Sequence, residues 1–124
     1  MKKLIFIVLL SFSCYAATTF TAFADLKTSV TDNTIKDAIL DFALNQDVAN
    51  FLEGKTLENV KFGEKFTTKS EIILTKITFK GTITLIEPEN FGNIKFDTVT
   101  VDSNATLKDS NNALCTISGG SLIN

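Results

Sequence analysis

Residues 73–85 read ILTKITFKGTITL and form the longest run of alternating apolar and polar side chains in the chain. The side chains expected on the buried face are Ile73, Ile77, Phe79, Ile83 and Leu85. Those expected on the opposite face are Lys76, Thr78, Lys80, Thr82 and Thr84. A period of two with one polar face is typical of a half-buried sheet and favours antiparallel pairing. Gly81 indicates a bulge or a tight turn that divides the run into two strands.

The segments that follow also have the character of strands joined by turns. Ile94 and Phe96 are in one phase and Val99 and Val101 in the other, so we expect a bend at 97–98. Turns are predicted at 87–90, 102–104 and 109–112, and short strands at 105–107 and 114–118. The pair at 119–120, both Gly, is suited to turning the chain into a last edge strand at 122–123.

The segment before this run has the period of a helix. Ile35, Ala38, Ile39, Phe42 and Ala43 fall at spacings of three and four, which predicts an apolar stripe on one helix face. The stripe then moves to Leu44, Val48, Phe51 and Leu52. We therefore expect one kinked helix or two short helices over 34–54, with Thr34 and Asp37 as a loose capping box, Asp47 recapping the second part and Gly54 ending it.

These elements predict an α+β fold, with an N-terminal helix followed by a mainly antiparallel sheet in one domain, residues 25–124. A small β-solenoid is the alternative. It would follow from the repeated hydroxyl pairs at 82–84, 98–100 and 116–118, which are 16 and 18 residues apart. Stacked coils could present such pairs as a flat array of hydroxyls, as some ice-binding proteins do.

The first residues have the layout of a secretory signal peptide. Met1-Lys2-Lys3 is positively charged, residues 4–10 carry no polar side chain, and Ala22-Phe23-Ala24 has the small-x-small pattern of a cleavage site. We therefore expect residues 1–24 to be removed, with cleavage between Ala24 and Asp25. Two alternatives stay open. Residues 4–24 are uncharged and long enough to be retained as a membrane anchor, and Cys14 lies in an imperfect context for lipidation.

The composition excludes several kinds of chemistry. The 124 residues contain no His, no Trp and no Arg, and the formal net charge is −2. Without His there can be no His-dependent catalytic triad and no imidazole metal ligand. An acidic chain whose basic residues are all Lys is poorly suited to nucleic acid, which selects dense basic patches.

No cluster of residues predicts a catalytic, cofactor or metal site. Glu87 and Glu89 share one small turn, which makes no cleft for paired carboxylates. The run from Asp102 begins like a calcium loop, but Leu107 and Ala113 occupy the positions that need Gly and Glu. An irregular calcium site between the Asp102 and Asp109 loops is left as a weak alternative.

Cys115 is the one cysteine that remains after removal of residues 1–24, and it lies in a run typical of a strand. We expect a buried inert thiol, and the alternative is a free thiol that pairs with another copy.

The sequence therefore predicts a small exported bacterial protein, secreted or periplasmic, that is not an enzyme and acts by binding or assembly through its sheet. The expected partner is a protein or an envelope component, a homo-oligomer is an alternative, and contact with a membrane would require the first segment to be retained. The candidate interaction edge is the weakly charged C-terminal end, with Leu114, Ile117, Leu122 and Ile123. The other functions considered are an exported hydrolase that uses carboxylates, Ser or Lys, with Asp97, Asp102 and Asp109 as the acids to test, and a membrane-tethered structural subunit.

Overall fold

The computed structural model describes residues 17–85 and 92–123. The first half contains β1 (Thr18–Phe20), α2 (Phe23–Ser29), β2 (Thr34–Leu40), α3 (Gln46–Leu52) and β3 (Thr56–Phe62). The middle contains β4 (Ile72–Thr75), β5 (Thr78–Lys80), β6 (Thr82–Thr84) and β7 (Ile94–Asp97). The chain continues with β8 (Thr100–Val101), β9 (Thr106–Lys108), β10 (Thr116–Ser118) and β11 (Ser121–Ile123).

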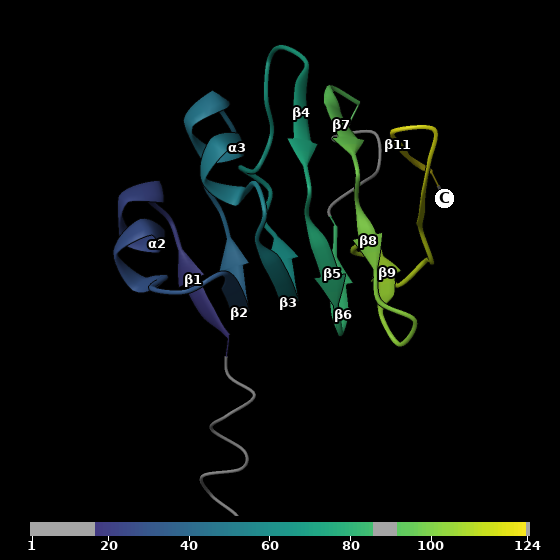
Figure 1. The fold of residues 1–124 in the computed structure, drawn as a ribbon, viewed down its shortest axis with the longest axis horizontal. Coiled ribbons are helices and arrows are strands. Elements are labelled where there is room, and N and C mark those ends of the chain that lie inside the picture. The colour runs from purple at the N-terminus through teal and green to yellow at the C-terminus, as the bar shows by residue number, and fades with distance from the viewer. Residues whose placement is uncertain (1–16, 86–91, 124) are drawn as a thin grey trace, which may run out of the picture.

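The strands stack in parallel, one coil of the chain upon the next (Figure 1). Thr34 pairs with Thr56, Thr56 with Thr78, and Thr78 with Thr100, so each of these coils advances by 22 residues. On a second side of the stack, β4 pairs with β7 at the same offset, Ile72 beside Ile94. This arrangement is a short β-solenoid, and the expectation of a mainly antiparallel sheet is wrong. Of the strand pairs in the described residues, only β10 with β11 is antiparallel.

Residues with positive φ form the corners of the coils. Asp37, Asn59 and Gly81 occupy equivalent positions, with φ values of 53°, 54° and 63°. Gly54, Lys76 and Thr98 form a second equivalent set, at 79°, 58° and 57°. Each corner turns the strand and shifts the phase of its side chains, so apolar residues on both sides of the corner point inward.

The corner at Asp37 explains why the helix expected over 34–54 is wrong. Residues 34–40 form β2, in which Ile35, Ala38 and Leu40 are buried. The corner inserts one extra residue between Ile35 and Ala38, and the resulting spacing of three imitates a helix. Thr34 therefore begins a strand and caps no helix. The helix of this segment is only α3, whose N-cap is Asn45 rather than Asp47: the Asn45 side chain accepts from Val48 N at 3.0 Å.

The run at 73–85 is partly as expected. Ile77, Phe79, Ile83 and Leu85 are buried, and Gly81 divides β5 from β6, as predicted. The predicted burial of Ile73 is wrong: its side chain is 51% exposed, whereas those of its neighbours Ile72 and Leu74 are buried. The corner at Lys76 lies between β4 and β5 and changes which residues point inward: even-numbered residues are buried before it and odd-numbered residues after it. A single alternation of buried and exposed residues therefore does not extend across the corner.

The later expectations have mixed outcomes. The bend at 97–98 is confirmed by the positive φ of Thr98, and the turn at 119–120 does join β10 to β11. The turn at 87–90 lies outside the described residues. The hydroxyl pairs at spacings of 16 and 18 are not equivalent positions, because Thr82 pairs with Thr106 and Thr116 belongs to the terminal hairpin.

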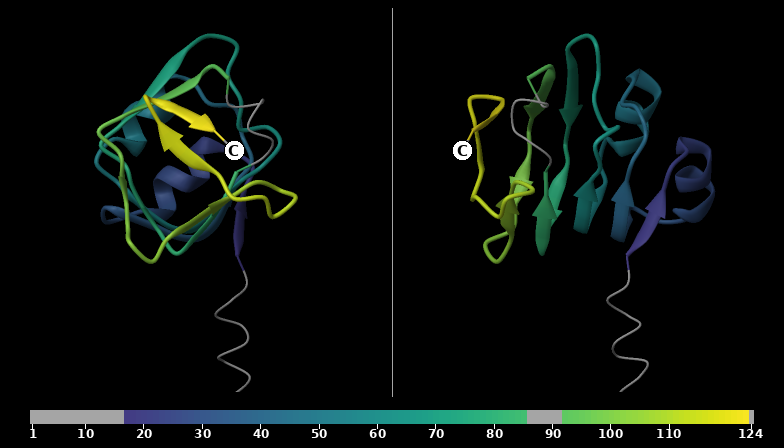
Figure 2. Two further views of the ribbon diagram at one scale, coloured as in Figure 1. Left: turned by 90° about the vertical axis from the view of Figure 1, so that its right-hand side faces the viewer. Right: turned by 180° about the vertical axis from the view of Figure 1, so that it is seen from behind.

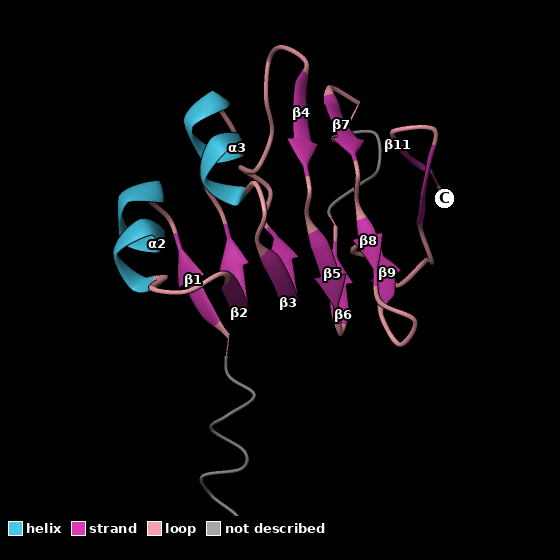
Figure 3. Cartoon of the chain, in the orientation of Figure 1, coloured by secondary structure: helices cyan, strands magenta, loops and turns pink. Residues whose placement is uncertain are grey.

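The core fills the inside of the coils, and different elements cover its two ends. Phe62, Phe66 and Phe79 are among its largest fully buried side chains. Figure 2 shows the outline of the coil, with the β10–β11 hairpin lying across the C-terminal end and α2 at the other end. The helices are confined to the first coils (Figure 3).

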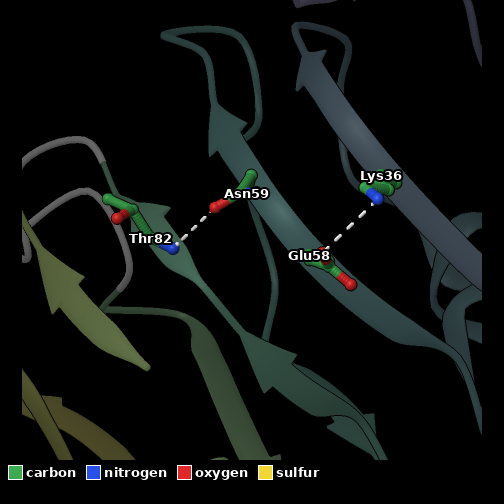
Figure 4. A network of polar contacts seen from close by, with 4 residues as sticks. All are labelled: Lys36, Glu58, Asn59 and Thr82. Atoms are coloured by element: carbon green, nitrogen blue, oxygen red, sulfur yellow. Dashed lines mark hydrogen bonds and ion pairs between the residues drawn. The ribbon is translucent and has the colours of Figure 1, made fainter. Parts of the chain in front are cut away.

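Side chains at the corners also hold neighbouring coils together. Asn59 Oδ1 accepts a hydrogen bond of 2.9 Å from Thr82 N in the next coil (Figure 4). Asp41 Oδ1 accepts from Lys65 N at 3.0 Å in the same way. A Cβ at Gly81 would contact the Asn59 amide, so this corner has room only for glycine.

We expect Asn59→Ala to lower the free energy of unfolding by about 2 kcal/mol. The substitution removes the acceptor for Thr82 N and places Ala in a left-handed conformation. Asn59→Asp keeps the oxygen and is the matched control. Urea denaturation followed by circular dichroism measures both, and equal stability of the two variants would contradict this role of the side chain.

Candidate functional site

The outward face of β2, β3, β5 and β8 repeats one three-residue pattern: Thr, an apolar residue, and a charged residue. The four copies are Thr34-Ile35-Lys36, Thr56-Leu57-Glu58, Thr78-Phe79-Lys80 and Thr100-Val101-Asp102. The middle residue points inward, and the outer two form a column of Thr and a column of charges. The charges alternate in sign from coil to coil. Lys36 Nζ lies 3.7 Å from Glu58 Oε2. Figure 4 shows this ion pair between β2 and β3.

β8 is the last strand of this face, and its second edge is uncovered. Thr100 N donates to Ile77 O and Asp102 N to Phe79 O, both at 2.9 Å, which pairs β8 with β5. Backbone groups alternate in direction along a strand, so the N–H and C=O of Val101 point away from β5. Among the described strands, none pairs with β8 on that side. Val101 is 42% exposed, whereas Leu57 and Phe79, its equivalents in the two preceding coils, are at most 1% exposed.

The C-terminal segment covers the neighbouring edges of the same coil. Cys115 N donates to Leu107 O at 2.9 Å and Asp109 N to Ala113 O at 2.9 Å, so residues 113–115 lie along β9. Phe96 N donates to Gly120 O at 2.9 Å, so the terminal hairpin also contacts β7. Among the described strands at this end of the solenoid, β8 is the one for which no backbone hydrogen bond to the C-terminal segment is found.

An edge of this kind can accept an extended segment of another chain as an added strand. The main-chain groups of Val101 provide a donor and an acceptor, and its side chain offers apolar surface. Asp102 continues the alternating column, in which the backbone register places each charge next to the opposite charge of the neighbouring coil. A segment that places Lys or Arg beside Asp102 would extend that alternation.

The interaction edge predicted from the sequence lies in the covering segment. Leu114 is 69% exposed and bridges to Lys108 beside β9. Ile117 is partly buried against the core. Leu122 and Ile123 pair with Ile117 and Thr116 within the hairpin. The structure does not bring these residues together with Val101 into one edge. The four-fold Thr–apolar–charged repeat at a step of 22 is a sequence signal that places residues 100–102 on the same face as the three preceding coils.

The residues predicted to flank signal cleavage lie within the folded region. Ala22 is the N-cap of α2, and Ala24 and Asp25 are in its first turn, all three exposed. None of the helices in the described part of the chain is long and apolar enough to cross a membrane.

The candidate acids have three different surroundings. Asp97, at the end of β7, lines a polar groove between α3 and β4 together with Gln46, Asn50, Glu53 and Glu71. Asp102 ends the column of charges. Asp109 is 5% exposed, and its Oδ1 accepts from Asn111 N at 2.8 Å and Ala113 N at 2.9 Å. Within residues 17–85 and 92–123, no three His, Cys, Asp or Glu side chains converge as metal ligands would. Glu87 and Glu89 lie outside the described residues.

No family model matches this chain, and no curated protein or solved structure matches it. The class of molecule is therefore defined by its fold, a short parallel β-solenoid, and its function must be argued from its own residues.

Asp109 shapes the loop that starts the covering segment, and we expect Asp109→Ala to lower the free energy of unfolding by about 2 kcal/mol. The substitution leaves the N–H groups of Asn111 and Ala113 without their carboxylate acceptor. Asp109→Asn keeps an oxygen acceptor and should lose less. Hydrogen exchange at Cys115 N–H, which reports opening of the segment, should accelerate in the Ala variant. Unchanged exchange would show that the loop does not depend on this carboxylate.

Cys115 is a buried free thiol, and the stability of the fold should depend on it at alkaline pH. Burial, and after it the negative charge of Asp109, raises the pKa of the Cys115 thiol above its ordinary value of 9.0. The folded state therefore favours the protonated thiol. That contribution is complete below about pH 9 and is lost as the pH rises through the folded pKa. The difference in unfolding free energy between the natural protein and Cys115→Ala should be constant from pH 6 to 8 and should fall above pH 9. Parallel profiles over the whole range would contradict this.

Proposed function

We propose that this chain is an exported bacterial protein that acts by binding, and that it binds an extended segment of a partner protein along β8. The observation that carries the proposal is the edge of β8 that no other described strand pairs with, at the end of the solenoid where the C-terminal segment contacts β7 and β9. The signal-peptide layout of the first residues supports export.

The geometry of β8 specifies the chemistry of the partner segment. It runs parallel to β8, since the coils of the face are parallel. It carries a hydroxyl or β-branched residue beside Thr100 and Lys or Arg beside Asp102, which continues the two columns of the face. The strand is short, so side-chain complementarity contributes to selectivity alongside the main-chain hydrogen bonds.

The binding proposal is tested with two synthetic peptides and the soluble domain. One peptide contains Thr-Ile-Lys within an extended β-branched sequence, and the matched control contains Thr-Ile-Glu. We expect the Lys peptide to shift the amide NMR signals of Thr100, Val101 and Asp102, and the Glu peptide to bind at least several-fold more weakly. Asp102→Lys should reverse that preference.

Val101→Pro isolates the role of the outward backbone N–H. Proline removes that donor but leaves the hydrogen bonds from Thr100 N and Asp102 N to β5, and it is tolerated in edge strands. Binding of the Lys peptide should be lost, while the urea midpoint stays close to that of the natural protein. Val101→Thr keeps the donor and should retain binding. Absence of peptide binding to the natural protein, or its survival in a folded Val101→Pro variant, would overturn the proposal.

A further inference from the structure

Residues 18–20 belong to the solenoid as its first strand. β1 pairs in parallel with β2, with Thr18 beside Ala38 and Phe20 beside Leu40. Asp41 N donates to Phe20 O at 2.9 Å, which extends the pairing by one residue. β1 therefore supplies backbone partners to the second arm of β2, after the corner at Asp37.

Residues 23–29 form the cover of the N-terminal end of the core. Leu26 of α2 is fully buried. The ring of Phe23 lies 5.9 Å from that of Phe42 and 5.5 Å from that of Phe51, measured between centroids. Phe42 is itself buried, so Phe23 joins the end cover to the body of the core.

Cleavage between Ala24 and Asp25 would divide this cover. The product would lose β1 and Phe23, and the second arm of β2 would become an open edge. Phe42 and Phe51 would lose a ring contact, and Leu26 would lie one residue from a new charged terminus. A mature domain that keeps the whole N-terminal cover must begin no later than Thr18.

A second small-x-small triplet lies at that point. Cys14-Tyr15-Ala16 places small side chains on both sides of Tyr15, and it is closer than Ala24 to the apolar run that ends at Leu10. We propose that signal peptidase cleaves between Ala16 and Ala17, so that β1 and α2 remain part of the exported domain. This inference rests on the export that is part of the proposed function.

The test is the intact mass of the protein recovered after expression of the full chain, residues 1–124, in a bacterial host. We expect a periplasmic or secreted product that begins at Ala17. A product that begins at Asp25 would overturn the cleavage position and leave export standing. A product that carries lipid on Cys14 would also overturn it. An unprocessed chain in the cytoplasm would overturn export itself, and the cleavage proposal with it.

Matched substitutions separate the two sites. Ala24→Phe places a large side chain at the downstream site and should leave the mass of the product unchanged apart from the substitution itself. Ala16→Phe should abolish the product that begins at Ala17. Any product then formed by cleavage after Ala24 lacks β1, and its urea midpoint should be lower than that of the natural product. Loss of processing in Ala24→Phe, or equal urea midpoints of the two products, would contradict the proposal.

Discussion

The structure depends on parallel backbone pairing between successive coils, at a step of 22 residues along β2, β3, β5 and β8, and this pairing depends on the corners. A coil closes upon the next one only if the strand turns at the same place each time. Asp37, Asn59 and Gly81 provide that turn in a left-handed conformation, which Gly adopts freely and Asn and Asp tolerate better than most residues. Once the corners are aligned, the inward residues stack into core columns and the outward residues into columns of Thr and of alternating charge.

A stack of coils has two ends, and the manner in which each is covered connects the fold to the proposed function. Each end would otherwise expose apolar side chains together with unpaired backbone groups. At the N-terminal end, β1 pairs with β2, and α2 covers the core with Leu26 and Phe23. At the C-terminal end, residues 113–115 pair with β9 and Gly120 with β7, but nothing described pairs with the outer side of β8. Among the described strands at the C-terminal end, the open edge of β8 therefore lies beside edges that the C-terminal segment contacts.

The alternation of apolar and polar residues predicts which side chains are buried within the stretch between two corners. The same alternation gives wrong predictions when it is extended across a corner. The prediction of burial is correct for Ile77, Phe79, Ile83 and Leu85. A glycine within a strand pattern indicates a bulge or turn, so the corner at Gly81 could be predicted. Asp37, Lys76 and Thr98 also form corners, but such residues give no comparable signal. The pattern of buried residues Ile35, Ala38 and Leu40 recurs as Leu57, Val60 and Phe62. Comparison of those two segments would have revealed the coil, whereas a periodicity taken within one segment indicated a helix.

The candidate site was beyond prediction for a related reason. Sequence reasoning favours the apolar, uncharged C-terminal end as an edge, and that end does consist of strands. Whether an edge is open, however, depends on contacts between distant residues, such as Cys115 N with Leu107 O and Phe96 N with Gly120 O. Those contacts make the C-terminal segment a cover and leave β8 exposed. The stacking of the coils also places four charges of alternating sign in one column: Lys36, Glu58, Lys80 and Asp102. Because the column ends on the negative charge of Asp102, the segment that best continues it carries a positive charge at the corresponding position.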